Sequence, residues 1–284
     1  MSQLQPPQHQ DHQPGDEHRM QPRPEYIREG YQGSGKLKGK VAVITGGDSG
    51  IGRAAAVHFA REGADCMITH VGSEEKDAEE TIRLIEAEGQ KASRIAGDIG
   101  DPAFCRKVIE GTLEEFGKLN ILVNNAAEQY DWNDVTEIDD EQLERTFKTN
   151  LFSHFYLIKA AVPHLSKGDS IIATSSVNAF KGNDSLIDYS ATKGAIQGLV
   201  RSLSGTLMDR GIRVNAVAPG PVWTPLIPAS FEDDKVAEFG KQVPMERPGQ
   251  PSEMGPAYVY LASDDSSYMS GQTIHLNGGV VLNT

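Results

Sequence analysis

Val41-Ala-Val-Ile-Thr-Gly-Gly-Asp-Ser-Gly-Ile-Gly52 is the stretch that decides the fold of this 284-residue chain. Its first part, Val41–Ile44, is a short apolar run that is typical of a buried parallel strand. The glycine-rich part begins at Thr45, and Ser49–Glu62 then has helical spacing of its apolar residues and stops at Gly63. The stretch therefore predicts a strand, a tight turn and a helix in direct succession.

The same alternation continues to the end of the chain. Strictly alternating units imply parallel strands, because parallel neighbours need long right-handed crossovers. We therefore predict an α/β fold with one Rossmann-type, doubly wound parallel sheet of seven strands and helices on both faces. The predicted strands are 41–44, 66–71, 92–99, 120–125, 170–174, 213–217 and 272–276, and the predicted helices are 49–62, 74–88, 101–116, 141–165, 189–208 and 253–263.

Two segments differ from this pattern. Residues 1–38 contain few aliphatic residues and many Gln, Pro and polar ones, a composition that cannot offset the entropy of ordering by burial. We predict a flexible or loosely draped arm there, followed by a dinucleotide-binding catalytic domain at 39–284. Within that domain, residues 221–249 combine Trp, Leu, Ile and Phe with several prolines, which suits a partly helical flap over a substrate.

Composition excludes several classes of function. The formal net charge of −13 argues against binding to nucleic acid or anionic lipid, which needs clustered Lys and Arg. We find no run of about 18 apolar residues, no secretory signal and no transit peptide, so we expect a cytoplasmic enzyme with no membrane partner. Cys66 and Cys105 support neither a disulfide framework nor a zinc site. His9, His12 and His18 could in principle hold a metal, but scattered histidines in a disordered tail far more often bind none, and we predict no metal.

The glycine-rich turn predicts a dinucleotide site. Glycines let a pyrophosphate approach backbone N–H groups at a helix N-terminus, where the helix dipole favours negative charge. NAD preference usually appears as an acid near the end of the second strand. Here Thr69–Ser73 lacks one, Glu74 and Glu75 come only afterwards, and Arg53 is placed either to meet a 2′-phosphate or to lie in solvent. We expect NADP or NAD, with a slight preference for NADP.

Tyr189 and Lys193 are spaced i and i+4, which puts both side chains on one face of a helix. A phenol titrates near pH 10, so acid/base work near neutral pH requires a lower pKa, and a nearby cation acts in that direction. Alone, such a pair is usually incidental. Ser176 and Asn124-Asn-Ala-Ala127 follow predicted strands, however, so both belong at the edge of the sheet where ligands bind.

Together with Asn150 and Pro219-Gly220, these residues resemble the short-chain dehydrogenase/reductase family in order and spacing, from about Leu37 to Gly279. Gln13-Pro14-Gly15, Asn124–Tyr130 and Trp223–Pro228 further resemble its subgroup of glucose and ribitol dehydrogenase homologues. The resemblance implies hydride transfer between a nicotinamide cofactor and a small carbonyl or alcohol. It also implies a homotetramer and, more weakly, a sugar or polyol substrate.

The resemblance also implies a role for each residue. Tyr189 would be the general acid or base, Lys193 would hold the nicotinamide ribose, and Ser176 would donate a hydrogen bond to the substrate oxygen. Asn150 would hold a water, Asp98 would contact adenine, and Asn124 would brace the sheet edge. The implied cofactor-binding residues are Gly46, Asp48, Ser49, Gly50, Ile51, Gly52, Asp98, Ile99, Asn124, Ala126, Tyr189, Lys193, Pro219, Gly220, Val222 and Thr224.

Polar residues near this edge suit a hydroxyl-rich substrate: Glu128, Gln129, Asn178 and Asn183. The main alternative is a catalytically silent dinucleotide-binding sensor or stress protein, which has no need of Tyr189, Lys193 and Ser176 together. A nucleotide-sugar epimerase or dehydratase would usually carry a larger C-terminal domain. A hydrolase using Ser176 is disfavoured, since no Gly-x-Ser-x-Gly elbow surrounds it.

Overall fold

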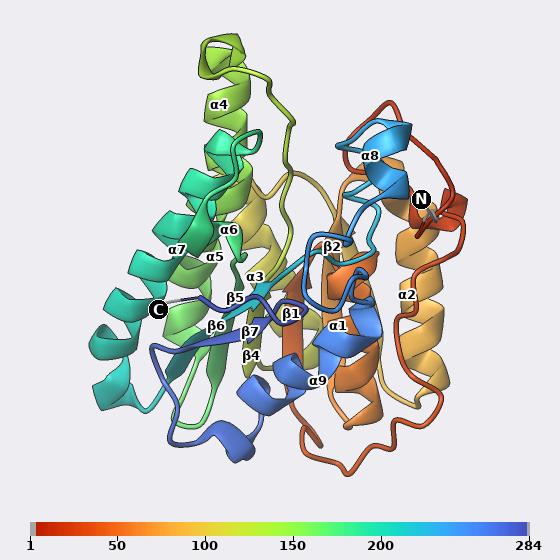
Figure 1. Ribbon diagram of the computed structural model, residues 1–284. Coiled ribbons are helices and arrows are strands. Elements are labelled where there is room, and N and C mark those ends of the chain that lie inside the picture. Colours follow the sequence, from red (N-terminus) through yellow and green to blue (C-terminus); the bar gives the residue numbers. More distant parts are fainter. Residues whose placement is uncertain (1–3, 283–284) are drawn as a thin grey trace.

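The computed structural model describes residues 4–282 and contains a seven-stranded parallel sheet with the strand order β3-β2-β1-β4-β5-β6-β7. Helices cover both faces of the sheet (Figure 1). The predicted fold class is confirmed. The strands are β1 Val41–Thr45, β2 Asp65–His70, β3 Ala92–Ala96, β4 Ile121–Asn124, β5 Ser170–Thr174, β6 Arg213–Pro219 and β7 Thr273–Leu276. The α-helices are α1 Gly50–Arg61, α2 Glu75–Ala87, α3 Pro102–Phe116, α4 Asp140–Phe147, α5 Ser153–Ala161, α6 Asn178–Lys181, α7 Ile187–Thr206, α8 Asp233–Ala237 and α9 Pro251–Ala262.

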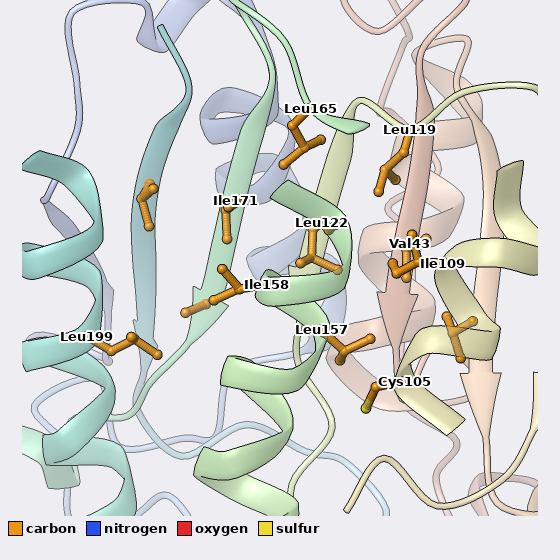
Figure 2. Close-up of a cluster of buried hydrophobic side chains, with 14 of the residues drawn as sticks. Val43, Cys105, Ile109, Leu119, Leu122, Leu157, Ile158, Leu165, Ile171 and Leu199 are labelled. Atoms are coloured by element: carbon orange, nitrogen blue, oxygen red, sulfur yellow. The ribbon is translucent and has the colours of Figure 1, made fainter. Parts of the chain in front are cut away.

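Two apolar cores hold these layers together, one on each face of the sheet. Successive side chains of a strand point to opposite faces, so neighbouring residues of β1 enter different cores. Val43 is in register with Leu122 of β4, and Leu122 with Ile171 of β5; these three pack against α3, α5 and α7 (Figure 2). Ala42 and Ile44 belong to the other core, with residues of α1, α2 and α9.

The predicted helix at 141–165 is interrupted. A single π-helical turn, Lys148–Phe152, separates α4 from α5 and contains the fully buried Asn150. π turns insert a residue into the helical ladder and are frequent at functional sites. Hydrophobic periodicity does not reveal such a turn, since the apolar spacing continues across it. The third strand ends at Ala96, earlier than predicted, and the short helix α6 was not predicted.

The N-terminal arm, which the composition suggested to be flexible, packs on the domain over residues 4–38. It runs along α2 and past α8, as Figure 1 shows in red. Met20 and Leu37 are buried in apolar clusters, and Glu17 is buried in an ion pair with Arg53. The composition of a segment indicates only how much apolar surface it can bury by itself. The arm is ordered because its side chains are buried against residues of the domain.

No α-helix in the described part of the chain is both long and apolar enough to cross a membrane.

Candidate active site

The turn between β1 and α1 needs glycine at several positions, of which Gly46 and Gly52 show why. Gly46 has a φ of +59°, in the left-handed region. A Cβ on Gly52 would lie 1.8 Å from the carbonyl oxygen of Gly46, so the helix start and the turn touch through their backbones. The Thr45 hydroxyl accepts hydrogen bonds from the N–H groups of Asn125 (2.9 Å) and Ala126 (3.1 Å), which fix the turn to the end of β4.

The start of α1 suits a phosphate group. The first backbone N–H groups of a helix have no partner within the helix, and the dipole there favours an anion. The Gly50 N–H already donates to the Glu17 carboxylate of the arm over 2.5 Å, so a phosphate would be held by the neighbouring positions; Ser49, Gly50 and Ile51 line the cavity described below. The glycine contacts and this helix start fit the pyrophosphate of a dinucleotide.

Arg53 does not meet a cofactor phosphate. Its side chain is buried and forms ion pairs with Glu17 and Asp77, and its Nε donates to the Thr81 hydroxyl over 2.9 Å. The expectation that Arg53 either contacts a 2′-phosphate or lies in solvent is therefore wrong. It instead joins the arm to α2, because a buried guanidinium needs partners for its N–H groups.

Two carboxyl groups lie at the other end of the turn. Asp48 is buried within it, and Glu74, which follows β2, lies beside Asp48; both line the cavity. Burial, together with the charge of Asp48, raises the pKa of Glu74 to about 10. Burial likewise raises the pKa of Asp48. Two adjacent buried carboxyls do not both ionise near neutral pH, so this pair carries at most one negative charge beside the end of the second strand.

Tyr189, Lys193 and Ser176 converge on the same cavity. The Lys193 Nζ donates to the Thr174 carbonyl over 2.8 Å and lies 5.4 Å from the centre of the Tyr189 ring. Burial raises the pKa of Tyr189 to about 12, and its hydrogen bond with Ser176 acts in the opposite direction. Burial lowers the pKa of Lys193 to about 7. This shift is opposite to the lower pKa expected from the sequence, because Lys193 does not offset the burial of the phenol. The phenol is therefore protonated at neutral pH, with an ionisable amine on the same helix face.

Asn150 is buried and binds the loop after β4 through two hydrogen bonds. Its Oδ1 accepts from the Glu128 N–H over 2.9 Å, and its Nδ2 donates to the Glu128 carbonyl over 2.8 Å. The Thr192 hydroxyl, one residue before Lys193, is a third contact at 3.4 Å. One turn after Asn150, burial lowers the pKa of His154 to about 3, so this ring stays neutral beside Lys193.

The cavity has a volume of about 660 Å³ and runs from the phosphate turn to the flap. Gly52, Asp98, Ile99, Asn124 and Asn150 lie outside its lining. Asp98 is half exposed, accepts from the Gly100 N–H over 2.8 Å and lies 3.6 Å from Arg145. The expected residues that do line the cavity are Gly46, Asp48, Ser49, Gly50, Ile51, Ala126, Ser176, Tyr189, Lys193, Pro219, Gly220, Val222 and Thr224.

Other residues of the site were not singled out from the sequence. Asn125, rather than Asn124, braces the turn: its Nδ2 donates to the carbonyls of Thr45 (3.2 Å) and Gly46 (3.3 Å). The side chain of Asn124 is buried without a hydrogen-bond partner among the described residues. Pro14 and Gly15 of the arm also line the cavity. The motif order contained Asn125, but nothing in the arm's composition pointed to the cavity.

The polar residues expected around a substrate divide into two sets. Gln129, Asn178 and Asn183 line the cavity, whereas Glu128 is turned to Arg145, with 3.2 Å between the Arg145 Nε and the carboxylate. The arm histidines do not converge: Nδ1 of His9 pairs with the Phe231 carbonyl, that of His12 with the Pro14 carbonyl and that of His18 with Asp77. Asp16, His18 and Asp77 do cluster, and they join the arm to α2.

Most of the similar curated proteins are named as oxidoreductases, dehydrogenases or reductases, and one that is 56% identical is named general stress protein 39 of Bacillus subtilis. The chain is 58% identical over 280 residues to the uncharacterized oxidoreductase YhdF of Bacillus subtilis, covering 99% of this chain and 96% of that protein. It is 52% identical to a glucose and ribitol dehydrogenase of Daucus carota, with 98% and 97% covered. It is 51% identical to the chloroplastic NADPH-dependent aldehyde reductase 1 of Arabidopsis thaliana, with 97% and 98% covered.

Solved structures agree with this placement. A short-chain dehydrogenase from Burkholderia cenocepacia in complex with NADP is 30% identical with a TM-score of 0.80, covering 86% of this chain and 98% of that one. A 3-ketoacyl-(acyl-carrier-protein) reductase from Brucella melitensis complexed with NADH is 29% identical with a TM-score of 0.78, at the same coverage. A family described as enoyl-(acyl carrier protein) reductase matches residues 46–281. The chain therefore belongs to the short-chain dehydrogenase/reductase family, whose members are NAD(P)-dependent oxidoreductases acting on alcohol and carbonyl groups.

Proposed function

We propose that this protein transfers a hydride between a nicotinamide cofactor and a carbonyl or alcohol carbon of a small molecule, with Tyr189 as the general acid or base. The observation that carries the proposal is that Tyr189, Lys193 and Ser176 line one cavity together with the phosphate turn. A binding protein that only senses a dinucleotide needs the turn, but it has no use for a phenol, an amine and a hydroxyl at the other end.

The nicotinamide, when bound, supplies or takes up the hydride. The protein supplies the proton: Tyr189, whose pKa burial raises, holds it near neutral pH and donates it to the oxygen of a carbonyl substrate. Ser176 donates a hydrogen bond to the same oxygen and stabilises the charge that develops there. Lys193, when protonated, lowers the pKa of the Tyr189 phenol, which supports proton uptake in the direction of alcohol oxidation.

The substrate we propose is a small sugar, polyol or aldehyde. Gln129, Asn178 and Asn183 offer amide groups in the cavity, and such groups pair with substrate hydroxyls. The relatives from Daucus carota and Arabidopsis thaliana are named for glucose and ribitol and for aldehydes. For the cofactor we propose NADP or NAD. The name of the Arabidopsis relative supports NADP, whereas the negative charge at Asp48 and Glu74 supports NAD.

We also propose a cytoplasmic homotetramer. Phe152 and Phe155, at the start of α5, leave 40% and 45% of their surface exposed in the single chain, which suits burial against another copy. A monomer mass in light scattering would remove this proposal.

The test is turnover by the full chain and by Tyr189→Phe. Cofactor absorbance is followed with NAD(H) and NADP(H), in both directions, against sugars, polyols, quinones, aldehydes and simple ketones. We expect Tyr189→Phe to lose activity by at least a hundredfold while it binds cofactor as before, and Tyr268→Phe, a fully exposed tyrosine, to keep full activity. Cofactor binding with no turnover on any compound would favour the silent sensor instead.

A further inference from the structure

The N-terminal arm forms part of the wall of the active-site cavity. Pro14 and Gly15 line it together with residues of the flap and of the phosphate turn. Gly15 approaches the flap so closely that an added Cβ would lie 2.6 Å from the Pro225 carbonyl oxygen and 3.0 Å from the Ala229 Cβ. The arm is thus packed against the flap by its backbone.

Gln13 pairs with the backbone of Gln129, at the end of the loop after β4. The Gln129 N–H donates to the Gln13 Oε1 over 3.1 Å, and the Gln13 Nε2 donates to the Gln129 carbonyl. The Asn150 amide makes the same two hydrogen bonds with the backbone of Glu128, the residue before Gln129. Consecutive residues of the loop are therefore held by two side-chain amides, one from the helical scaffold and one from the arm.

The flap meets the arm and this loop at the same point. The Ser230 Oγ lies 3.4 Å from the Gln129 carbonyl oxygen that Gln13 contacts, and its hydroxyl donates to the Leu226 carbonyl over 2.5 Å. The Gln10 N–H donates to the Pro228 carbonyl over 2.8 Å. Gln129, which lines the cavity, is thereby fixed by the arm, with the flap packed beside it.

Strong contacts hold the arm on either side of Gln13. On one side, Glu17 is buried against Arg53 and the Gly50 N–H. On the other, Gln10 is buried and its amide bonds to the backbone of Asp16. The family match begins at residue 46, after the arm, whereas YhdF matches 99% of the chain. The sequence of the arm is therefore shared with relatives such as YhdF, whereas the family match does not include it.

We propose that Gln13 is a positioning residue for the substrate: it sets the place of Gln129 in the cavity and leaves the cofactor site alone. The proposal rests on the proposed function, because it assigns Gln129 to the substrate end of that site. It predicts that loss of the Gln13 amide weakens substrate binding and has little effect on the chemical step.

Gln13→Ala tests this, and the chain offers a matched control. Gln8 makes the same kind of pair inside the arm, with its Nε2 donating to the Gln21 carbonyl over 2.5 Å and its Oε1 accepting from the Gln21 N–H over 3.1 Å. Gln8 lies outside the cavity lining. We expect Gln13→Ala to raise KM for the best carbonyl substrate about tenfold, to change kcat less than threefold and to leave the cofactor Kd within twofold. Gln8→Ala should change none of the three.

A KM for Gln13→Ala within twofold of the native value would overturn the proposal, as would equal effects of the two variants, which would reflect general loosening of the arm. Hydrogen exchange at the Gln129 amide gives a readout that needs no turnover. Exchange there should speed up at least tenfold in Gln13→Ala and stay unchanged in Gln8→Ala. If the native chain turns over no compound, the proposed function fails; unchanged exchange at Gln129 would overturn the role of Gln13 itself.

Discussion

Lys193 donates a hydrogen bond to the carbonyl of Thr174 over 2.8 Å, and no carboxylate in the described part of the chain pairs with it. The amine is almost fully buried, with 1% of its surface exposed. A buried charge without a counter-charge destabilises the folded state, which is why burial lowers the pKa of Lys193 to about 7. Lys193, which we propose lowers the pKa of Tyr189, thus destabilises the folded chain.

Lys193→Met should therefore abolish turnover and stabilise the cofactor-free protein at pH 7. The pKa is about 7 in the folded state against 10.5 ordinarily, so between these values the unfolded chain binds more protons and stability rises with pH. Lys193→Met should remove that rise. Thermal melts from pH 6.5 to 9.5 measure it, with the exposed Lys107→Met as control. A less stable Lys193→Met with an unchanged slope would contradict the argument.

The strands and the helices that cover them could be predicted from the sequence. A parallel strand is buried on both faces and therefore appears as an apolar run, as in Val41–Ile44, and the helix of each crossover is marked by helical spacing of its apolar residues. The position of Tyr189 and Ser176, which we propose to be catalytic, follows for a related reason, since Tyr189 lies near the start of α7 and Ser176 just after β5. The π turn at Asn150 and the docked arm could not be predicted, because both depend on partners distant in sequence. Arg53 was misread for the same reason: its partners, Glu17 and Asp77, come from the arm and α2.

Gly52→Ala should destroy cofactor binding. The new Cβ would lie 1.8 Å from the Gly46 carbonyl and 2.8 Å from the Asn125 Nδ2, so the turn would have to open. We expect the Kd of either cofactor to rise at least a hundredfold, measured by fluorescence titration. Gly198→Ala is the control: nothing lies near its added Cβ within α7, and removing a mid-helix glycine should stabilise the protein by about 0.5–1 kcal/mol.

The Asp48 and Glu74 pair should set the balance between the two cofactors. The two carboxyls lie beside the end of β2, where the adenosine ribose of a dinucleotide is held, and a negative charge on either of them repels a 2′-phosphate. The double variant Asp48→Asn with Glu74→Gln removes the charge and should favour NADP over NAD at least tenfold more than the native chain does. Each single variant should shift the Kd ratio less, because the remaining carboxyl then ionises.

The exposed Glu86→Gln on α2 serves as the control for general charge, and its Kd ratio should equal the native one. If the double variant had the native ratio of the NADP and NAD Kd values, the carboxyl pair would lie away from the 2′ position of the adenosine ribose.

Trp223→Phe should loosen the flap without emptying its core. The Trp223 Nε1 donates to the Pro22 carbonyl over 2.8 Å, and the ring packs with Met20 of the arm and with Ile227 and Val236 of the flap. Phenylalanine keeps much of this packing and loses the hydrogen bond, so we expect a loss of about 1 kcal/mol in unfolding free energy and faster proteolysis within residues 221–249.

The second tryptophan provides the matched comparison. The Trp132 Nε1 is buried without a hydrogen-bond partner among residues 4–282, so Trp132→Phe removes an unsatisfied donor and should leave stability unchanged or slightly raised. Urea unfolding and limited proteolysis of both variants decide the matter. If Trp223→Phe resists protease as the native chain does, the bond to Pro22 does not hold the flap, and the remaining contacts, such as the Met20 packing and the Gln10–Pro228 bond, keep the arm and flap together.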